Sequence, residues 1–164
     1  PEAIGRYPHA KVWGAPGLAD KRKDVSFDAT LGDVEAPWAE EFEPLLLEGN
    51  AWLAEVVFRH GASSTLVVTD LVFNIHEVDN VWTRWTLRSA GAFGKLAQSK
   101  LWRFTTRDRA AMQRSIESML QWDFERVVMA HGRVLESGGR AALGETLWWM
   151  RGQRALGSQT AYAD

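Results

Sequence analysis

The sequence has 164 residues, of which 46% are hydrophobic and 24% are charged. This composition is typical of one folded domain with a sizeable core and excludes an intrinsically disordered chain. The sequence contains no cysteine, which excludes disulfides, thiolate metal sites and cysteine nucleophiles and favours a reducing compartment. No apolar run reaches the roughly 20 residues of a membrane-spanning helix, so we expect no transmembrane segment.

The charges are unevenly distributed along the chain, although the net charge is only −2. Residues 24–55 contain nine acids and no Lys or Arg, whereas residues 81–114 contain eight bases and one acid, Asp108. Such segments are either solvated faces that neutralise each other in the fold or, for the basic segment, a site for an anionic ligand or partner. We favour solvated faces because the bases are spread out, and we expect no nucleic-acid partner.

Turn residues dominate the first 40 residues. Pro8 and the pair Pro16-Gly17 bound a short strand, residues 18–23 form a short helical piece, and residues 24–38 are expected to be irregular. The pair Gly49-Asn50 then predicts a hairpin turn between two strands.

Residues 56–74 hold two apolar runs, separated by a Gly-Ala-Ser-Ser break at 61–64. This pattern predicts two buried strands joined by a short turn. His60 closes the first run and Asp70 closes the second. Ligand sites in layered α/β folds gather at strand ends, but on this stretch alone a hairpin with solvated polar ends is the favoured interpretation.

The next segment is rich in tryptophan. His76 lies among acidic and amide residues and is either a ligand or a solvent-facing loop residue. Three tryptophans, Trp82, Trp85 and Trp102, fall within residues 81–104, and the first two share a face if the chain is helical. Packing is the first interpretation of this segment, and contact with a protein partner or membrane surface is the second.

The last third of the chain reads as helix, strand and helix. Residues 105–121 form the clearest helix, and Thr105 with Asp108 resembles a capping pair. Residues 124–130 have a buried-strand pattern that ends at His131. Residues 140–151 form a closing helix, so we expect one domain over 1–154 and a flexible tail over 155–164.

Histidine, aspartate and histidine thus follow one another, each at the end of an apolar strand. This order resembles the later metal-ligand motifs of the metallo-β-lactamase fold: His60 with Ser64 is similar to its histidine turn, Asp70 to its metal-bridging aspartate, and His131 to its final histidine. The closest resemblance is to a branch of unknown function found in bacteria and plant plastids. It is carried by residues 7–10, 15–18, 28–33, 57–60, 64–74 and 122–132.

The resemblance implies an α/β fold, a metallo-β-lactamase-like αββα sandwich that is partial here. The His-x-His-x-Asp-His cluster that supplies most of the first metal site in this superfamily does not occur in the sequence. The ligands that remain are His60, Asp70 and His131, with His76 as an additional candidate. They imply zinc, iron or manganese, or no cofactor at all, and the branch implies the bacterial cytoplasm or the plastid stroma.

Two functions follow from this incomplete ligand set. The favoured one is a degenerate, non-catalytic binding module or subunit of a larger assembly, which meets a protein partner or a second copy through Trp82, Trp85 and Trp102. The alternative is a metal-dependent hydrolase that uses a water activated by one ion held by His60, Asp70 and His131. A half-sandwich would also expose an apolar sheet face that a partner must cover.

Overall fold

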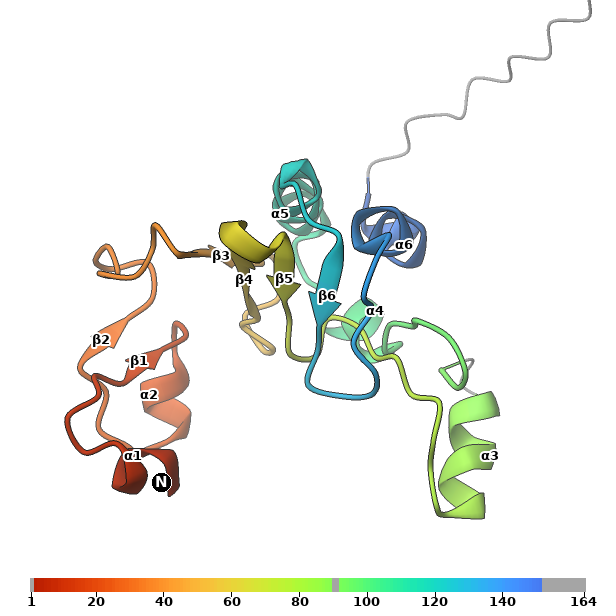
Figure 1. Cartoon of the computed structure of the whole chain (residues 1–164), viewed down its shortest axis with the longest axis horizontal. Helices are drawn as coiled ribbons and strands as arrows, with labels where there is room; N and C mark the ends of the chain where they lie inside the picture. The colour runs from red at the N-terminus through yellow and green to blue at the C-terminus, as the bar shows by residue number, and fades with distance from the viewer. Residues whose placement is uncertain (1, 90–91, 152–164) are drawn as a thin grey trace, which may run out of the picture.

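The computed structural model describes residues 2–89 and 92–151, and its centre is a four-stranded mixed sheet (Figure 1). The strands are β3 (Phe42–Leu46), β4 (Val56–His60), β5 (Thr65–Val67) and β6 (Arg126–Val128), in that spatial order. β4 is antiparallel to both β3 and β5, whereas β5 and β6 are parallel. The predicted tail, residues 155–164, lies outside the described residues.

The N-terminal segment forms a small unit beside the sheet (Figure 1). It consists of α1 (Glu2–Arg6), β1 (Trp13–Gly14), α2 (Leu18–Lys21) and β2 (Ala29–Thr30), and β1 pairs with β2 in parallel. The short strand and short helix predicted here are therefore present, within a largely irregular segment.

Two contacts connect this unit to the rest of the molecule. The ring of Trp13 meets that of Trp38 edge to face at 5.8 Å between centroids, and Trp38 in turn contacts Phe58 on β4 at 5.9 Å. The Lys21 ammonium donates a hydrogen bond to the carbonyl of Trp52 at 2.8 Å.

The remaining helices lie between and after the strands of this sheet in the chain. They are the 3-10 turn η1 (Gly61–Ser63), the helices α3 (Val81–Ser89), α4 (Leu101–Thr105), α5 (Arg109–Gln121) and α6 (Gly139–Thr146), and the 3-10 turn η2 (Trp148–Met150). None of the helices in the described part of the chain is long and apolar enough to cross a membrane.

Helix α5 starts later than the sequence suggested. Asp108 is its N-cap, and one of its carboxylate oxygens accepts a hydrogen bond from the amide of Ala111 at 2.9 Å. Thr105 instead ends α4, and its hydroxyl donates to the carbonyl of Leu101. The proposed Thr105–Asp108 capping pair is therefore wrong, because the aspartate alone satisfies the free amides of the first turn.

One face of the sheet carries the core. Strand residues alternate between two faces, and Val57, Leu66 and Val127 point to the face that α5 and α6 cover. The buried stripe of α5, Met112, Ile116 and Met119, packs in the same cluster as the α6 residue Leu143 and the following Leu147. Figure 1 shows both helices along one side of the sheet.

On the other face, the described part of the chain places no helix over the centre of the sheet (Figure 1). One row of paired residues crosses all four strands on this side: Pro44, Phe58, Val67 and Val128. All four are apolar and only half-buried. We call these four residues the outer apolar row.

The structure therefore confirms a mixed α/β class. A proline such as Pro44 fits here because β3 is an edge strand, where no further ladder partner requires its missing amide. Across residues 2–89 and 92–151, α5 and α6 cover one face of the sheet, which gives one sheet layer and one helix layer.

Candidate site at the ends of strands β5 and β6

The parallel pairing of β5 and β6 brings Asp70 and His131 together. Each residue follows the last residue of its strand by three positions, at the same edge of the sheet. The Nε2 atom of His131 lies 3.2 Å from Oδ1 of Asp70, and both side chains are half exposed, at 58% and 52%. Of the four candidate ligands, all within the described residues, Asp70 and His131 are the two that meet.

The backbone of Asp70 is held from two sides. The carboxylate of Glu55, which is buried, accepts hydrogen bonds from the amides of Thr69 at 2.7 Å and Asp70 at 3.1 Å. The indole Nε1–H of Trp102 donates to the carbonyl of Asp70 at 2.9 Å. These bonds fix the turn that presents the Asp70 side chain.

His131 is positioned by the segment after β5 and by the glycine that follows it. Its carbonyl accepts a hydrogen bond from the amide of Asn74 at 3.1 Å, and its ring lies 5.6 Å from that of Phe73. Gly132 has φ +101°, and a Cβ atom at this position would collide with the backbone of Asn74. Only glycine combines this conformation with so close a backbone contact.

His60 lies at the opposite end of the sheet. It pairs with Thr65, the first residue of β5, whereas Asp70 lies beyond the last. Five residues of extended chain correspond to roughly 16 Å. The ring of His60 stacks on Phe42 at 4.7 Å, and its Nδ1 atom lies 2.7 Å from Oγ of Ser63. The expected convergence of His60 with Asp70 and His131 is therefore not found.

His76 also has a partner of its own. Its Nε2 atom lies 2.8 Å from Oδ1 of Asn74, whose amide group donates to the carbonyl of Arg133. His76 thus helps to connect the segment after β5 with the segment after β6. Among the described residues, no hydrogen bond or ion pair joins its side chain to Asp70 or His131.

The described residues do not fit a catalytic metal. A catalytic zinc takes about three protein ligands and keeps one position open. Across residues 2–89 and 92–151, no group of three or more His, Asp or Glu side chains is close enough to hold an ion. Asp70 and His131 supply two donors, and these two atoms lie within hydrogen-bonding distance of each other.

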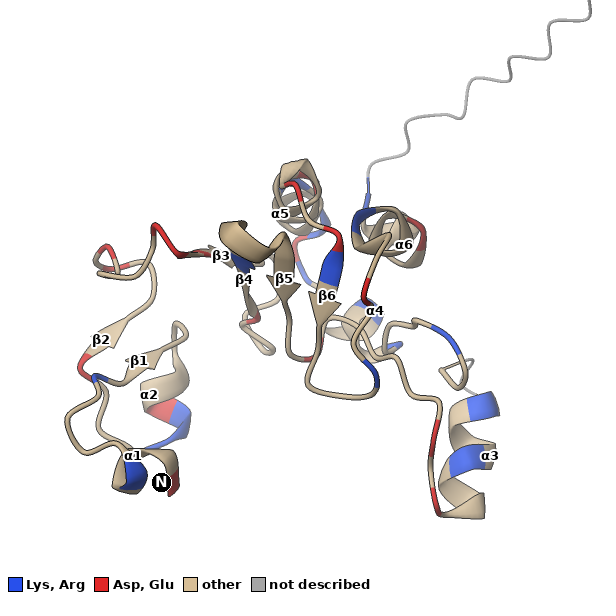
Figure 2. Cartoon of the chain, viewed as in Figure 1, with Lys and Arg blue, Asp and Glu red and all other residues tan. Residues whose placement is uncertain are grey.

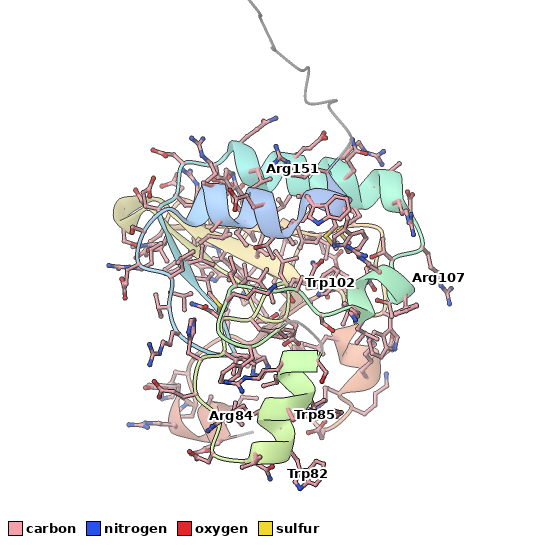
Figure 3. The ribbon with its side chains drawn as sticks, turned by 90° about the vertical axis from the view of Figure 1, so that its right-hand side faces the viewer. Trp82, Arg84, Trp85, Trp102, Arg107 and Arg151 are labelled. Atoms are coloured by element: carbon pink, nitrogen blue, oxygen red, sulfur yellow. The ribbon has the colours of Figure 1, made fainter. Side chains whose placement is uncertain are left out.

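The three tryptophans proposed as a partner surface separate into two groups. Trp82 and Trp85 on α3 are 78% and 65% exposed, and Figure 3 shows Trp82 at the tip of the helix. Trp102 is 1% exposed and lies in the core. Its assignment to an exposed surface is wrong, because its indole is buried against Asp70 rather than presented to solvent.

Sequence reasoning missed Glu55. Its carboxylate is buried and fully used by the turn before Asp70, so it supports the candidate site without belonging to it. A signal was present in the sequence: an acid stands directly before the apolar run of β4, where a solvated acid is unexpected.

At this edge, Asp70 and His131 therefore form a half-exposed pair on a turn that hydrogen bonds hold in place. No third metal ligand joins the pair within the described structure. Comparison with protein-family models gives no match to this chain, and comparison with curated proteins gives none either.

Proposed function

We propose that this chain is a degenerate, non-catalytic module of the metallo-β-lactamase type that works by binding, as a subunit of an assembly. The fold part of the proposal is supported by the mixed sheet and by the meeting of Asp70 and His131 at one strand edge. The lack of a third ligand beside them, within the described chain, favours binding over hydrolysis.

The observation that carries the proposal is the outer face of the sheet. The outer apolar row runs across all four strands, and each of its residues is half-buried rather than covered. Beside it lies a hollow of about 350 Å³ that is lined by Trp38, Phe42, Phe58 and Val67. A face made of such residues is stabilised when another apolar surface removes it from water.

The surface that fits this face best is another sheet. Two sheets pack face to face about 10 Å apart through interdigitated apolar side chains. The outer apolar row is uncharged, so two copies of it can meet without like-charge repulsion. The charged groups lie at the ends of the face, where Glu41 stands by His60 and Arg126 pairs with Glu136. We therefore propose a second copy of this chain as the partner.

Helix α3 gives this assembly a second contact. Within the described structure none of its residues is buried, and Trp82 and Trp85 stand on it three residues apart. Exposed tryptophans are enriched at protein interfaces because they supply a large contact area at little entropic cost.

Sedimentation equilibrium over a wide concentration range tests the proposal. We expect the wild-type chain to self-associate and Val67→Lys, on the outer face, to weaken the association at least about tenfold. Ala141→Lys is the control, because Ala141 is an exposed residue of α6, on the opposite, helix-covered side of the sheet. A monomer at all concentrations, or equal effects of the two variants, would contradict the proposal. Circular dichroism checks that each variant is folded.

The alternative, a hydrolase with one ion held by His60, Asp70 and His131, has one favourable observation, the Asp70–His131 contact. It requires His60 to leave the stack on Phe42 and to reach the opposite end of the sheet. We therefore retain the non-catalytic module as the proposed function.

A further inference from the structure

Two hollows with a basic and aromatic lining lie away from both the outer sheet face and the Asp70–His131 edge. Their volumes are about 290 and 280 Å³, and they share Arg103, Trp148 and Trp149 as lining residues. The second hollow is completed by Arg109, the first residue of α5, and by Arg151 after η2. We call this second hollow the arginine pocket.

The aromatic side of the arginine pocket is preorganised. The guanidinium carbon of Arg103 lies 5.7 Å from the ring centroid of Trp148 and 5.2 Å from that of Trp149. The indole N–H of Trp149 donates to Oε1 of Gln98 at 2.7 Å, which fixes its ring. Trp148 is 64% exposed, so its ring remains accessible to a ligand.

The three arginines of the pocket carry charge that nothing in the described structure neutralises. None of the ion pairs among residues 2–89 and 92–151 includes Arg103, Arg109 or Arg151. Glu145 lines the first hollow but not the arginine pocket. The mutual repulsion of the three guanidinium groups is relieved when an anion binds between them.

Within the described chain, the bases of residues 81–114, which include Arg103 and Arg109, also lack direct ion pairs with the acidic segment, residues 24–55. No described ion pair joins an acid of residues 24–55 to a base of residues 81–114. Figure 2 shows the acidic positions on the segment that leads into β3 and basic positions on α3, far from it. The interpretation of the two segments as mutually neutralising faces is therefore not supported by direct pairs.

We propose that the arginine pocket binds a nucleoside phosphate. Guanidinium groups hold phosphate oxygens in a bidentate manner, and Arg109 and Arg151 both line the pocket. One guanidinium nitrogen of Arg151 donates to the carbonyl of Gly144 at 3.2 Å, which holds this side chain at the pocket. A planar base stacks on an exposed indole, and Trp148 offers one at the same pocket. The volume of about 280 Å³ is just below the roughly 300–1,000 Å³ range of small-molecule sites, which suits a single nucleotide rather than a polymer.

The test is a titration of the isotope-labelled full chain with adenosine monophosphate, adenosine and inorganic phosphate, followed through the tryptophan indole N–H signals. The Trp148 signal is assigned by its loss in Trp148→Phe. We expect adenosine monophosphate to shift this signal saturably and to bind about tenfold more tightly than phosphate, because phosphate lacks the stacking base. Adenosine, which lacks the charge, should bind more weakly than adenosine monophosphate.

Paired variants locate the site. The double variant Arg109→Gln/Arg151→Gln should weaken binding of adenosine monophosphate at least about tenfold, since both phosphate contacts are lost. Arg107→Gln is the matched control, because Arg107 is exposed, lines neither hollow, and points away from the body of the molecule in Figure 3. Arg107, Arg109 and Arg151 are all exposed, so the variants are expected to fold.

Three results would overturn the proposal: no saturable shift with adenosine monophosphate, equal weakening by Arg107→Gln and the double variant, or phosphate binding as tightly as the nucleotide. None of them bears on self-association through the outer sheet face, so this proposal and the proposed function fail independently.

Discussion

The indole N–H of Trp102 donates a hydrogen bond to the backbone carbonyl of Asp70, 2.9 Å away and 32 positions earlier in the chain. Trp102 belongs to α4 and is buried, so this bond connects the core to the edge where Asp70 meets His131. The residue is therefore structural, and its effect on the edge is to position Asp70.

Trp102→Phe should lower the free energy of unfolding by about 2 to 3 kcal/mol. The substitution leaves the Asp70 carbonyl without its partner and removes part of a buried ring. Urea denaturation measures the change. Trp82→Phe is the control and should stay within about 0.5 kcal/mol of wild type, because Trp82 is exposed. Equal losses for the two variants would contradict the assignment.

Glu55→Gln should also destabilise the fold, by about 2 kcal/mol. The buried carboxylate accepts from the Thr69 amide and hydroxyl and from the Asp70 amide, and a carboxamide turns one acceptor into a donor that faces other donors. Glu48→Gln, at an exposed position, is the control. Faster amide hydrogen exchange at Asp70 is expected only in the Glu55 variant; an unchanged rate would be inconsistent with this role.

Gly132→Ala should cost about 2 kcal/mol or more. Position 132 has φ +101° and no room for a Cβ against the Asn74 backbone. Gly61→Ala is the matched control, because a Cβ at position 61 meets nothing within 4 Å and φ is not positive there. Thermal unfolding of both variants checks the prediction, which fails if the two melt at the same temperature.

Zinc should not bind tightly to the edge at Asp70 and His131. Two donors are present there, and removing one of them in His131→Ala should leave calorimetric zinc titrations unchanged at micromolar metal. Micromolar binding that is lost in both His131→Ala and His60→Ala would contradict the account, since it would require the two histidines to share one ion. His76→Ala serves as a further comparison.

The pattern of the chain predicted the elements better than their relative placement. Apolar runs predicted β4 and β5, and the apolar stripe at Met112, Ile116 and Met119 predicted α5. These features depend on local periodicity, which a single sequence contains. The first turn of α5 was misplaced because Thr105 and Asp108 both resemble caps, and only the three-dimensional contacts distinguish them.

The site was predicted in part for a geometric reason. In a hairpin, the first strand ends at the turn and the second ends at the far edge, so His60 and Asp70 had to separate. Asp70 and His131 met because β5 and β6 are parallel, a pairing between residues about 60 positions apart that local sequence does not specify. The burial of Trp102 was likewise decided by tertiary packing, since it resembles Trp82 and Trp85 in local composition.

The central claim is that two copies associate face to face through the outer sheet face. Cross-linking of single-cysteine variants tests it most directly, and such variants are simple to make because the chain has no cysteine of its own. Arg126 lies on the outer face beside Val128, whereas Arg140 lies on α6, on the helix-covered side, and both are exposed. With a bifunctional maleimide that spans about 10 Å, the separation of packed sheets, we expect Arg126→Cys to form a covalent dimer and Arg140→Cys to remain monomeric. Dimers formed by Arg140→Cys alone, or by neither variant, would contradict the account.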